Sequence, residues 1–266
     1  MNRPLDSLTQ ALLDAATKAG ADAADALAVE GSSTEIDVRN GTLEQAERSE
    51  GTDIGLRVFI GRRSAVVSSS DTKDSTIATM AERAVAMARE APEDPYAGLA
   101  DPAQLARDWD IEALEMCDPT DAPSPAELQE DACAAEAAAL AVEGIGQVQS
   151  ASAGYGRRQV HLAASNGFSG GYWRSSRSRS CVAIAGTGLE MERDYDGDSR
   201  TFQSELRGAA EIGRRAAERA LERQNPRRPK TGAYPVLFDE RIAASLIGHL
   251  IAAANGAAVA RGASWL

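Results

Sequence analysis

The stretch Thr34-Glu-Ile-Asp-Val-Arg-Asn-Gly41 decides the fold class of this chain. Polar and apolar residues alternate along it as far as Asn40-Gly41, a pair that adopts positive φ easily and therefore favours a two-residue hairpin turn. Residues 54–60 and 64–68 repeat the pattern around a Gly61-Arg62 turn. Turns this short join antiparallel neighbours, because a parallel crossover needs a dozen or more residues. The sequence therefore predicts antiparallel sheet combined with helices, the α+β class.

Helices are predicted on both sides of these strands. Apolar residues recur at helical spacing over residues 5–19 and 77–89. After a proline-rich break at 92–102, Ser124-Pro-Ala-Glu127 has the pattern of a capping box and begins a helix that we expect to end near Glu143. Further strands are predicted at 147–155, 159–164, 168–174, 178–185 and 189–195, with turns at Gly156-Arg157 and Asn166-Gly167, before a last helix over 208–223.

This order predicts two helix–antiparallel sheet–helix units followed by the start of a truncated C-terminal domain. We assign residues 1–91 to an N-terminal unit, 92–123 to a linker and 124–229 to a middle unit. Residues 230–266 would begin the further domain, with a strand from Tyr234 and then a helix over about 239–254.

Composition restricts the class of function. The 266 residues include 28 Lys and Arg against 40 Asp and Glu, and the net charge of −12 argues against direct nucleic-acid binding. No stretch approaches the roughly 20 apolar residues that span a bilayer, and the N-terminus lacks the apolar core of a secretion signal. The cysteines Cys117, Cys133 and Cys181 have no metal-binding spacing, which predicts buried thiols in a cytoplasmic protein.

Several longer strings match a known family. They are Gly55–Ile60, Met87–Leu99, Asn166–Gly170, Met191–Asp196, Ile212–Ala220, Leu246–Leu250 and Ala263–Leu266. Among them, Pro92-Glu-Asp-Pro-Tyr-Ala-Gly-Leu99 and Met191-Glu-Arg-Asp-Tyr-Asp196 are the most specific. Through these strings nearly the whole chain resembles the N-terminal part of the PmbA/TldE branch of the TldD/PmbA metallopeptidase family.

The resemblance has a consequence for metal binding. The TldD subunit of that family carries zinc on a helix with the motif His-Glu-x-x-x-His. Aligned on this chain, the second histidine is His249, but Ala244 replaces the first histidine and Ser245 replaces the glutamate. Alanine has no ligating atom, and serine is a poor substitute for the carboxylate that would activate zinc-bound water. The resemblance therefore implies no catalytic residue and no metal in this chain, with zinc in a TldD-like partner.

The resemblance also implies a function. The chain would be the non-metal subunit of a cytosolic TldD/TldE-type complex that binds unfolded peptide and acts in proteolysis and peptide maturation, in a family linked to modulation of DNA gyrase. An alternative is a stand-alone binding or scaffolding protein without a peptidase partner. Family members continue past Leu266, so we also expect either self-association through the apolar stripe Ile242, Leu246, Ile247, Leu250 and Ile251, or mobility from about Gly232 onward.

Two other patterns are candidate sites. Arg177 and Arg179 share a strand face with Cys181, whereas Arg174 points the other way, and these three arginines are candidates for contacting a peptide or a partner subunit, the alternative being a solvated strand face. Asp194 to Glu205 places acidic residues at EF-hand spacing. Ser199 stands where that loop needs glycine, so an acidic solvated loop is the preferred interpretation.

Overall fold

The computed structural model describes residues 3–108 and 110–266, which form two compact units, Met1–Asn225 and Pro226–Leu266. The first unit contains the helices α1 (Leu5–Lys18), α2 (Asp74–Glu90), α3 (Pro125–Leu140) and α4 (Ala209–Glu222) and the short 3-10 turns Pro102–Gln104, Gly188–Glu190 and Gln203–Glu205. Its strands are β1 (Ala23–Arg39), β2 (Thr42–Ile60), β3 (Arg63–Ser69), β4 (Ile145–Ala164), β5 (Ser169–Ala185) and β6 (Glu192–Arg200). The second unit contains α5 (Glu240–Ala253) and α6 (Gly256–Ala260).

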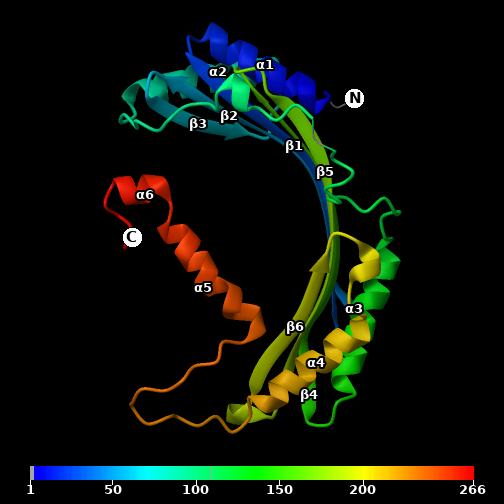
Figure 1. The fold of residues 1–266 in the computed structure, drawn as a ribbon. Helices are drawn as coiled ribbons and strands as arrows, with labels where there is room; N and C mark the ends of the chain where they lie inside the picture. The colour runs from blue at the N-terminus through cyan, green and yellow to red at the C-terminus, as the bar shows by residue number, and fades with distance from the viewer. Residues whose placement is uncertain (1–2, 109) are drawn as a thin grey trace. The chain divides into compact units, whose positions relative to one another are not determined.

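All six strands of the first unit belong to one antiparallel sheet in the order β3-β2-β1-β4-β5-β6 (Figure 1). The α+β class is therefore confirmed. The central pairing of β1 with β4 joins residues from the predicted N-terminal and middle units, so both contribute three strands to the same sheet. No helix among the described residues is long and apolar enough to cross a membrane.

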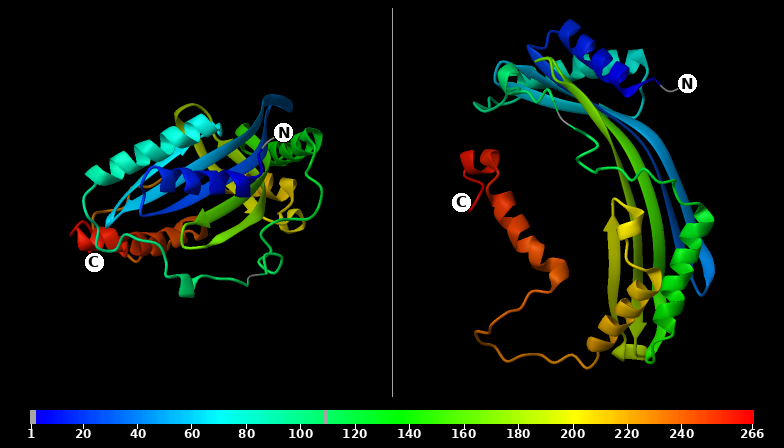
Figure 2. Two further views of the ribbon diagram at one scale, coloured as in Figure 1. Left: turned by 90° about the horizontal axis from the view of Figure 1, so that it is seen from above. Right: turned by 45° about the vertical axis from the view of Figure 1, so that its right-hand side comes forward.

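The four helices of this unit cover one face of the curled sheet (Figures 1 and 2). Along β1 the even-numbered residues face the helices: Ala24, Ala26 and Ala28 are buried in a cluster with α1 and α2, and Ile36 and Val38 are buried against α3. On the opposite face, no helix formed by the described residues of this unit is present. The two helix pairs cover the two ends of β1. Residues 29–35, in the middle of this strand, lie between the pairs and are not buried, so the middle of the sheet is open to solvent.

The predicted turns at Asn40-Gly41 and Asn166-Gly167 are confirmed. Asn40, Gly41 and Gly167 have φ of 55°, 70° and 95°, which is the left-handed backbone that these turns need. The capping box at Ser124 is also confirmed: its hydroxyl accepts from the Glu127 amide, and the Glu127 carboxylate accepts from the Ser124 amide.

Four predictions of local structure were wrong. Gly156-Arg157 is no turn, because Gly156 keeps a strand conformation inside β4, and residues 168–174 and 178–185 are parts of the single strand β5. The acidic stretch from Asp194 is mostly strand β6 rather than a solvated loop. No strand begins at Tyr234, where residues 233–239 have no regular structure.

Candidate functional site

The degenerate zinc motif lies on α5 in the second unit. Ala244, Ser245 and His249 are all exposed on this helix. The Ser245 hydroxyl donates to the Ile242 carbonyl oxygen at 2.6 Å, so it is already engaged within its own helix. Across residues 3–108 and 110–266, no three His, Cys, Asp or Glu side chains gather in a group that could hold a metal ion. The residues at the motif positions therefore do not fit a catalytic zinc ion.

The predicted apolar stripe of α5 is exposed in this unit. Its five large side chains, Ile242, Leu246, Ile247, Leu250 and Ile251, are between 46% and 68% exposed. Asp239 begins the helix, because its side chain accepts from the Arg241 amide at 2.9 Å. A surface of this kind is typical of an interface.

The structure separates the three candidate arginines. Arg177 is buried on the helix-bearing face, where its guanidinium group pairs with Asp131 of α3 at 2.5 Å. Arg179 pairs with the same Asp131 oxygen at 2.8 Å and donates to the Arg207 carbonyl. Arg174 is exposed on the opposite face of β5. The alternation predicted for this strand is therefore present, but Arg177 and Arg179 attach the sheet to α3.

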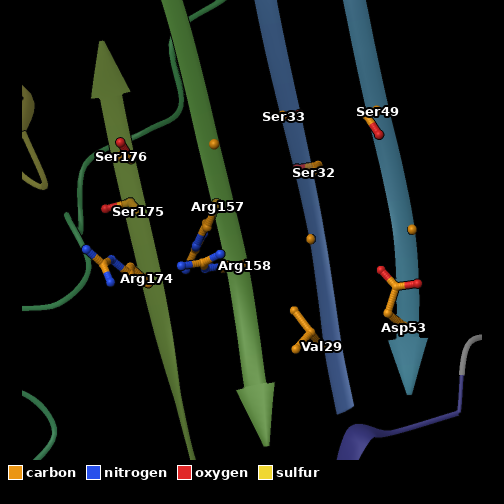
Figure 3. Close-up of a pocket in the computed structure, with 13 residues that line it drawn as sticks. Val29, Ser32, Ser33, Ser49, Asp53, Arg157, Arg158, Arg174, Ser175 and Ser176 are labelled. Atoms are coloured by element: carbon orange, nitrogen blue, oxygen red, sulfur yellow. The ribbon is translucent and has the colours of Figure 1, made fainter. Parts of the chain in front are cut away.

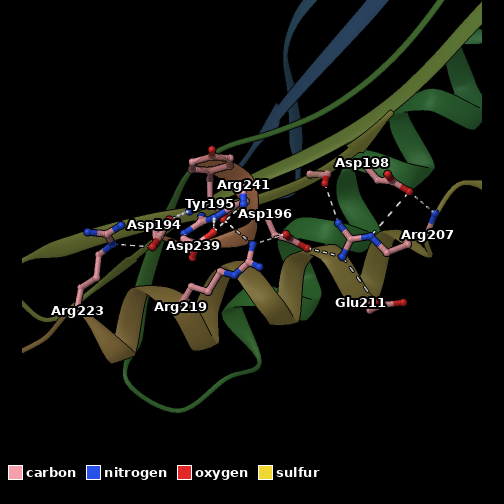
Figure 4. A network of polar contacts seen from close by, with 11 residues as sticks. Asp194, Tyr195, Asp196, Asp198, Arg207, Glu211, Arg219, Arg223, Asp239 and Arg241 are labelled. Atoms are coloured by element: carbon pink, nitrogen blue, oxygen red, sulfur yellow. Dashed lines mark hydrogen bonds and ion pairs between the residues drawn. The ribbon is translucent and has the colours of Figure 1, made fainter. Parts of the chain in front are cut away.

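The acidic residues of β6 form ion pairs with arginines on and beside α4 (Figure 4). Asp196 is buried and receives Arg207 at 2.7 Å and Arg219 at 2.5 Å. Asp194 receives Arg223 at 2.6 Å. Alanine at these positions would leave arginines without their acceptor, so the stretch that has EF-hand spacing is a structural connection between strand and helix.

Hydrogen bonds in this network shift two pKa values. Burial alone would raise the pKa of Asp198, but the backbone amide of Arg207 and the guanidinium groups of Arg200 and Arg207 outweigh it and lower this pKa. The bond to Asp196 raises the pKa of Arg207 further above its usual value. Both shifts favour the charged forms of Asp198 and Arg207.

A hollow of about 510 Å³ lies over the open middle of the sheet and is lined by residues of β1, β2, β4 and β5 (Figure 3). One cross-strand row explains it: Gly51 pairs with Gly31, Gly31 with Arg158, and Arg158 with Arg174. Paired residues share a face, and Arg174 is on the face without helices, so the whole row lies there. Two glycines without side chains thus adjoin two exposed arginines. We call this the central hollow.

Small polar residues form the next row of the central hollow. This row crosses β2, β1, β4 and β5 and consists, in that order, of Ser49, Ser33, Gly156 and Ser176. On the other side, Asp53 of β2 is exposed and pairs with Val29. The hollow is therefore polar, with the carboxylate of Asp53 on β2 and the cations of Arg158 and Arg174 on this face, and Arg157 of β4 also reaches its lining.

A second hollow of about 600 Å³ also involves the middle of the sheet, and most of its lining side chains point to the helix-bearing face. Its main feature is Arg157, whose guanidinium carbon lies 4.6 Å from the centre of the Trp173 ring. Glu30 and Glu50 also line it. Both Arg157 and Arg158 are exposed, but the stacking on Trp173 gives Arg157 a defined place.

The remaining reactive groups are held in packing contacts. His161 Nδ1 lies 2.9 Å from the Thr9 hydroxyl of α1. Cys181 is fully buried, and burial raises its thiol pKa to about 12, so it packs as a small apolar residue as predicted. Cys117 and Cys133 are only half-buried.

Arg158 and the glycine row were missed by sequence reasoning. The cause was the assignment of Gly156-Arg157 to a turn, which removed the middle of β4 from the predicted sheet. The available signal was the alternation that continues on both sides of Gly156, with Ala151 and Ala153 before it and Ala163 after it on one face.

Comparisons with known proteins agree on one family. PmbA/TldA metallopeptidase domain 1 matches residues 24–88, and the PmbA/TldA metallopeptidase central domain matches residues 118–224. The metalloprotease PmbA of Escherichia coli O157:H7 is 32% identical over 87% of this chain and 51% of its own length. A PmbA homolog of Haemophilus influenzae is 29% identical over 96% of this chain and 56% of its own length. The chain thus spans about half the length of these relatives.

Solved structures agree with the fold. A protein from Bacteroides thetaiotaomicron, described as a proposed modulator of DNA gyrase, superimposes with a TM-score of 0.84 at 25% identity over 95% of this chain and 57% of its own. TldE from Thermococcus kodakarensis superimposes with a TM-score of 0.65 at 16% identity, over 80% of this chain and 47% of its own. At 16% identity, the similarity to TldE shows a shared fold only.

Proposed function

The chain belongs to the PmbA/TldA metallopeptidase family, and from that premise we propose that it is the non-metal subunit of a peptidase complex whose TldD-like partner holds the catalytic zinc. In this role it completes a chamber in the cytoplasm and binds unfolded peptide, while the partner cleaves it. Peptide maturation and the modulation of DNA gyrase are the processes in which we expect such a complex to act.

One observation carries the proposal: the motif helix is present but lacks the groups that zinc needs. Ala244 has no donor atom and the Ser245 hydroxyl is bound to the Ile242 carbonyl, which leaves His249 alone. A catalytic zinc site takes three protein ligands and an open position. The exposed apolar side chains of α5 support the partner part of the proposal, because such a helix face is suited to an interface.

The test is co-expression with a TldD-like protein that has an intact His-Glu-x-x-x-His helix. We expect the two proteins to co-elute in size-exclusion chromatography and elemental analysis to find zinc in proportion to the partner only. Digestion of an unfolded peptide should require both proteins and be abolished by a chelator. His249→Ala in this chain should leave zinc content and digestion unchanged, whereas loss of the partner's first motif histidine should abolish both.

The alternatives give different results in the same experiment. A stand-alone binding protein would remain separate from the partner, and peptide digestion would be the same with and without it. Self-association through α5 would give a larger species in the absence of the partner, which Ile247→Glu should reduce. About one tightly bound zinc per copy of this chain would overturn the proposal.

A further inference from the structure

The central hollow contains a pair of like charges that the fold itself does not neutralise. Arg158 of β4 and Arg174 of β5 are directly opposite each other in the antiparallel ladder and lie on the same face. Directly opposite residues have Cβ atoms about 5 Å apart, and like charges at this distance destabilise a sheet. A counter-charge placed between them would relieve that repulsion.

Within the part of the chain that the structure describes, no side chain supplies this counter-charge. Among the described residues, neither Arg158 nor Arg174 has an ion-pair or hydrogen-bond partner, although acidic residues outnumber basic ones by 40 to 28. The arginines on the helix-bearing face of β5 do have an acidic partner, since Arg177 and Arg179 both pair with Asp131. Two adjacent arginines that stay unpaired in an acidic protein are positioned for an external anion.

The shape beside the arginines suits an extended chain. Gly31 and Gly51 continue the arginine row, and a Cβ on Gly31 would lie 3.0 Å from the Arg158 Cβ and 3.1 Å from the Arg157 carbonyl oxygen. Glycine at position 31 therefore keeps the floor low where the arginine side chain begins. Serines in the neighbouring row offer hydroxyl groups to peptide amides and carbonyls.

We propose that the central hollow binds an extended acidic peptide segment, with a glutamate or aspartate carboxylate held by Arg158 and Arg174. This inference rests on the proposed function and specifies the class of peptide that the subunit selects. Arginine donates paired N–H groups to a carboxylate, and two facing arginines surround one carboxylate with charge-assisted hydrogen bonds. Asp53, on the opposite side of the hollow, sets the direction of the peptide, because it repels a second acidic residue there.

A peptide is favoured over a nucleic acid by the charges around the hollow. The hollow is lined by three arginines, of which Arg157 stacks on Trp173, and by one carboxylate, and the whole chain carries a net charge of −12. A polyanion would need many more phosphate contacts and would be repelled by the rest of the surface.

The experiment uses the full chain and a fluorescein-labelled Gly/Ser peptide with glutamate at alternate positions, compared with the same peptide carrying glutamine. Fluorescence anisotropy should show binding of the glutamate peptide and at least about tenfold weaker binding of the glutamine peptide, since tenfold corresponds to the loss of one good charged interaction. The double variant Arg158→Gln/Arg174→Gln should bind the glutamate peptide as weakly as the wild type binds the glutamine peptide.

The matched control is Arg83→Gln/Arg214→Gln, which changes the net charge equally at two exposed arginines on α2 and α4. This control should bind the glutamate peptide like the wild type. The Arg158/Arg174 variant should melt at the same temperature as the wild type or higher, because it removes a repulsion. Equal weakening by both double variants, or equal affinity for the two peptides or for a single-stranded oligonucleotide, would overturn the inference.

The outcome is independent of complex formation. Failure to bind acidic peptide, together with co-elution with the TldD-like protein, would remove the inference and leave the proposed function. Selective peptide binding without co-elution would support acidic-peptide binding by the central hollow and would contradict the proposed pairing with a TldD-like protein.

Discussion

The two helix-covered ends of the sheet are built from different side chains on the same plan. In the leucine end, α1 and α2 pack on β1 and β2 through long aliphatic residues such as Leu8, Leu12 and Leu56. In the alanine end, α3 and α4 pack on β4 and β5 mainly through Ala135, Ala139, Ala151, Ala183, Ala185, Ala209, Ala216, Ala217 and Ala220, together with the fully buried Ile212. At the other part of α3, Leu128 is buried against Ile36 and Val38 of β1.

The difference shows two ways to stabilise one architecture. A buried leucine removes far more apolar surface from water than an alanine, so the leucine end obtains most of its stability from the hydrophobic effect. Small side chains let backbones approach instead: a Cβ on Gly213 of α4 would lie 1.9 Å from the Ala135 carbonyl oxygen of α3. The alanine end then adds the ion pairs of the buried Asp196 of β6 with Arg219 of α4 and with Arg207, which precedes α4.

The largest effect should come from breaking this ion-pair network. Asp196→Ala removes the shared acceptor of Arg207 and Arg219 and leaves both cations partly buried. We expect a loss of about 3 kcal/mol in the free energy of unfolding, at the lower end for a broken buried pair because both arginines reach solvent. Urea unfolding followed by circular dichroism measures it.

The control for this prediction is the ion pair of the leucine end. Asp25→Ala breaks the contact with Arg57, whose side chain is 46% exposed, and should cost no more than about 1 kcal/mol. Equal costs for the two variants would contradict the idea that the alanine end depends on charge more than the leucine end does.

The second prediction concerns the close approach of α3 and α4. Gly213→Ala should destabilise the chain by about 2 kcal/mol, because the new methyl group meets a backbone oxygen that cannot rotate away. Gly248→Ala is the matched change within α5, where an added Cβ meets nothing within 4 Å, and it should be neutral or stabilising. Thermal unfolding of both variants measures the difference, and a neutral Gly213→Ala would show that the helices can separate freely.

The sequence predicted each helix of the first unit to within about three residues, because amphipathic spacing and the capping box are local signals. It did not predict the joining of β1 and β4, since pairing between residues over 100 positions apart leaves no local mark. The division of β4 into two predicted strands has a related cause. Gly156 is a residue type common in turns, and only pairing with the neighbouring strands shows that it belongs to a continuous strand.

Only part of the candidate site could be predicted from the sequence. Ala244 and Ser245 could be read against the family motif, and the alternation correctly separated Arg174 from Arg177 and Arg179. That Arg177 and Arg179 would be engaged by Asp131, and that Arg174 would face Arg158, depends on strand register and on the position of α3. Composition carries no information about either.

A third, smaller effect should come from a polar contact inside the leucine end. Thr9 is fully buried on α1, and its hydroxyl donates to the Asp6 carbonyl at 2.9 Å and lies 2.9 Å from His161 Nδ1. Thr9→Val keeps the shape and removes both contacts, so we expect a loss of about 1 kcal/mol in the free energy of unfolding. Thr9→Ser, which keeps the hydroxyl, is the control in the same urea titration. If the Thr9→Val variant were more stable than the wild type, the Thr9 hydroxyl would make no net contribution to the stability of this end.

The smallest effect should be a difference in acid sensitivity between the two ends. The pKa of Asp198 is lowered in the folded state, so its carboxylate contributes stability that is complete above the unfolded value of about 4 and is lost as the pH falls through the folded pKa. In the leucine end the pKa of Asp71 is also lowered, by the Thr76 hydroxyl and the Lys73 amide, but that side chain is 45% exposed and solvent screens its contribution.

Hydrogen exchange measures this difference at the two ends in one sample. Between about pH 6 and about pH 3.5, chosen to bracket the ordinary aspartate pKa, amide protection corrected for intrinsic exchange rates should fall more in α4 than in α1. Asp198→Asn should reduce the pH dependence of α4, because the amide cannot titrate, while leaving that of α1 unchanged. Equal loss of protection at the two ends in the wild type would show that acid opens the sheet as one cooperative unit, since β1 and β4 connect the ends directly.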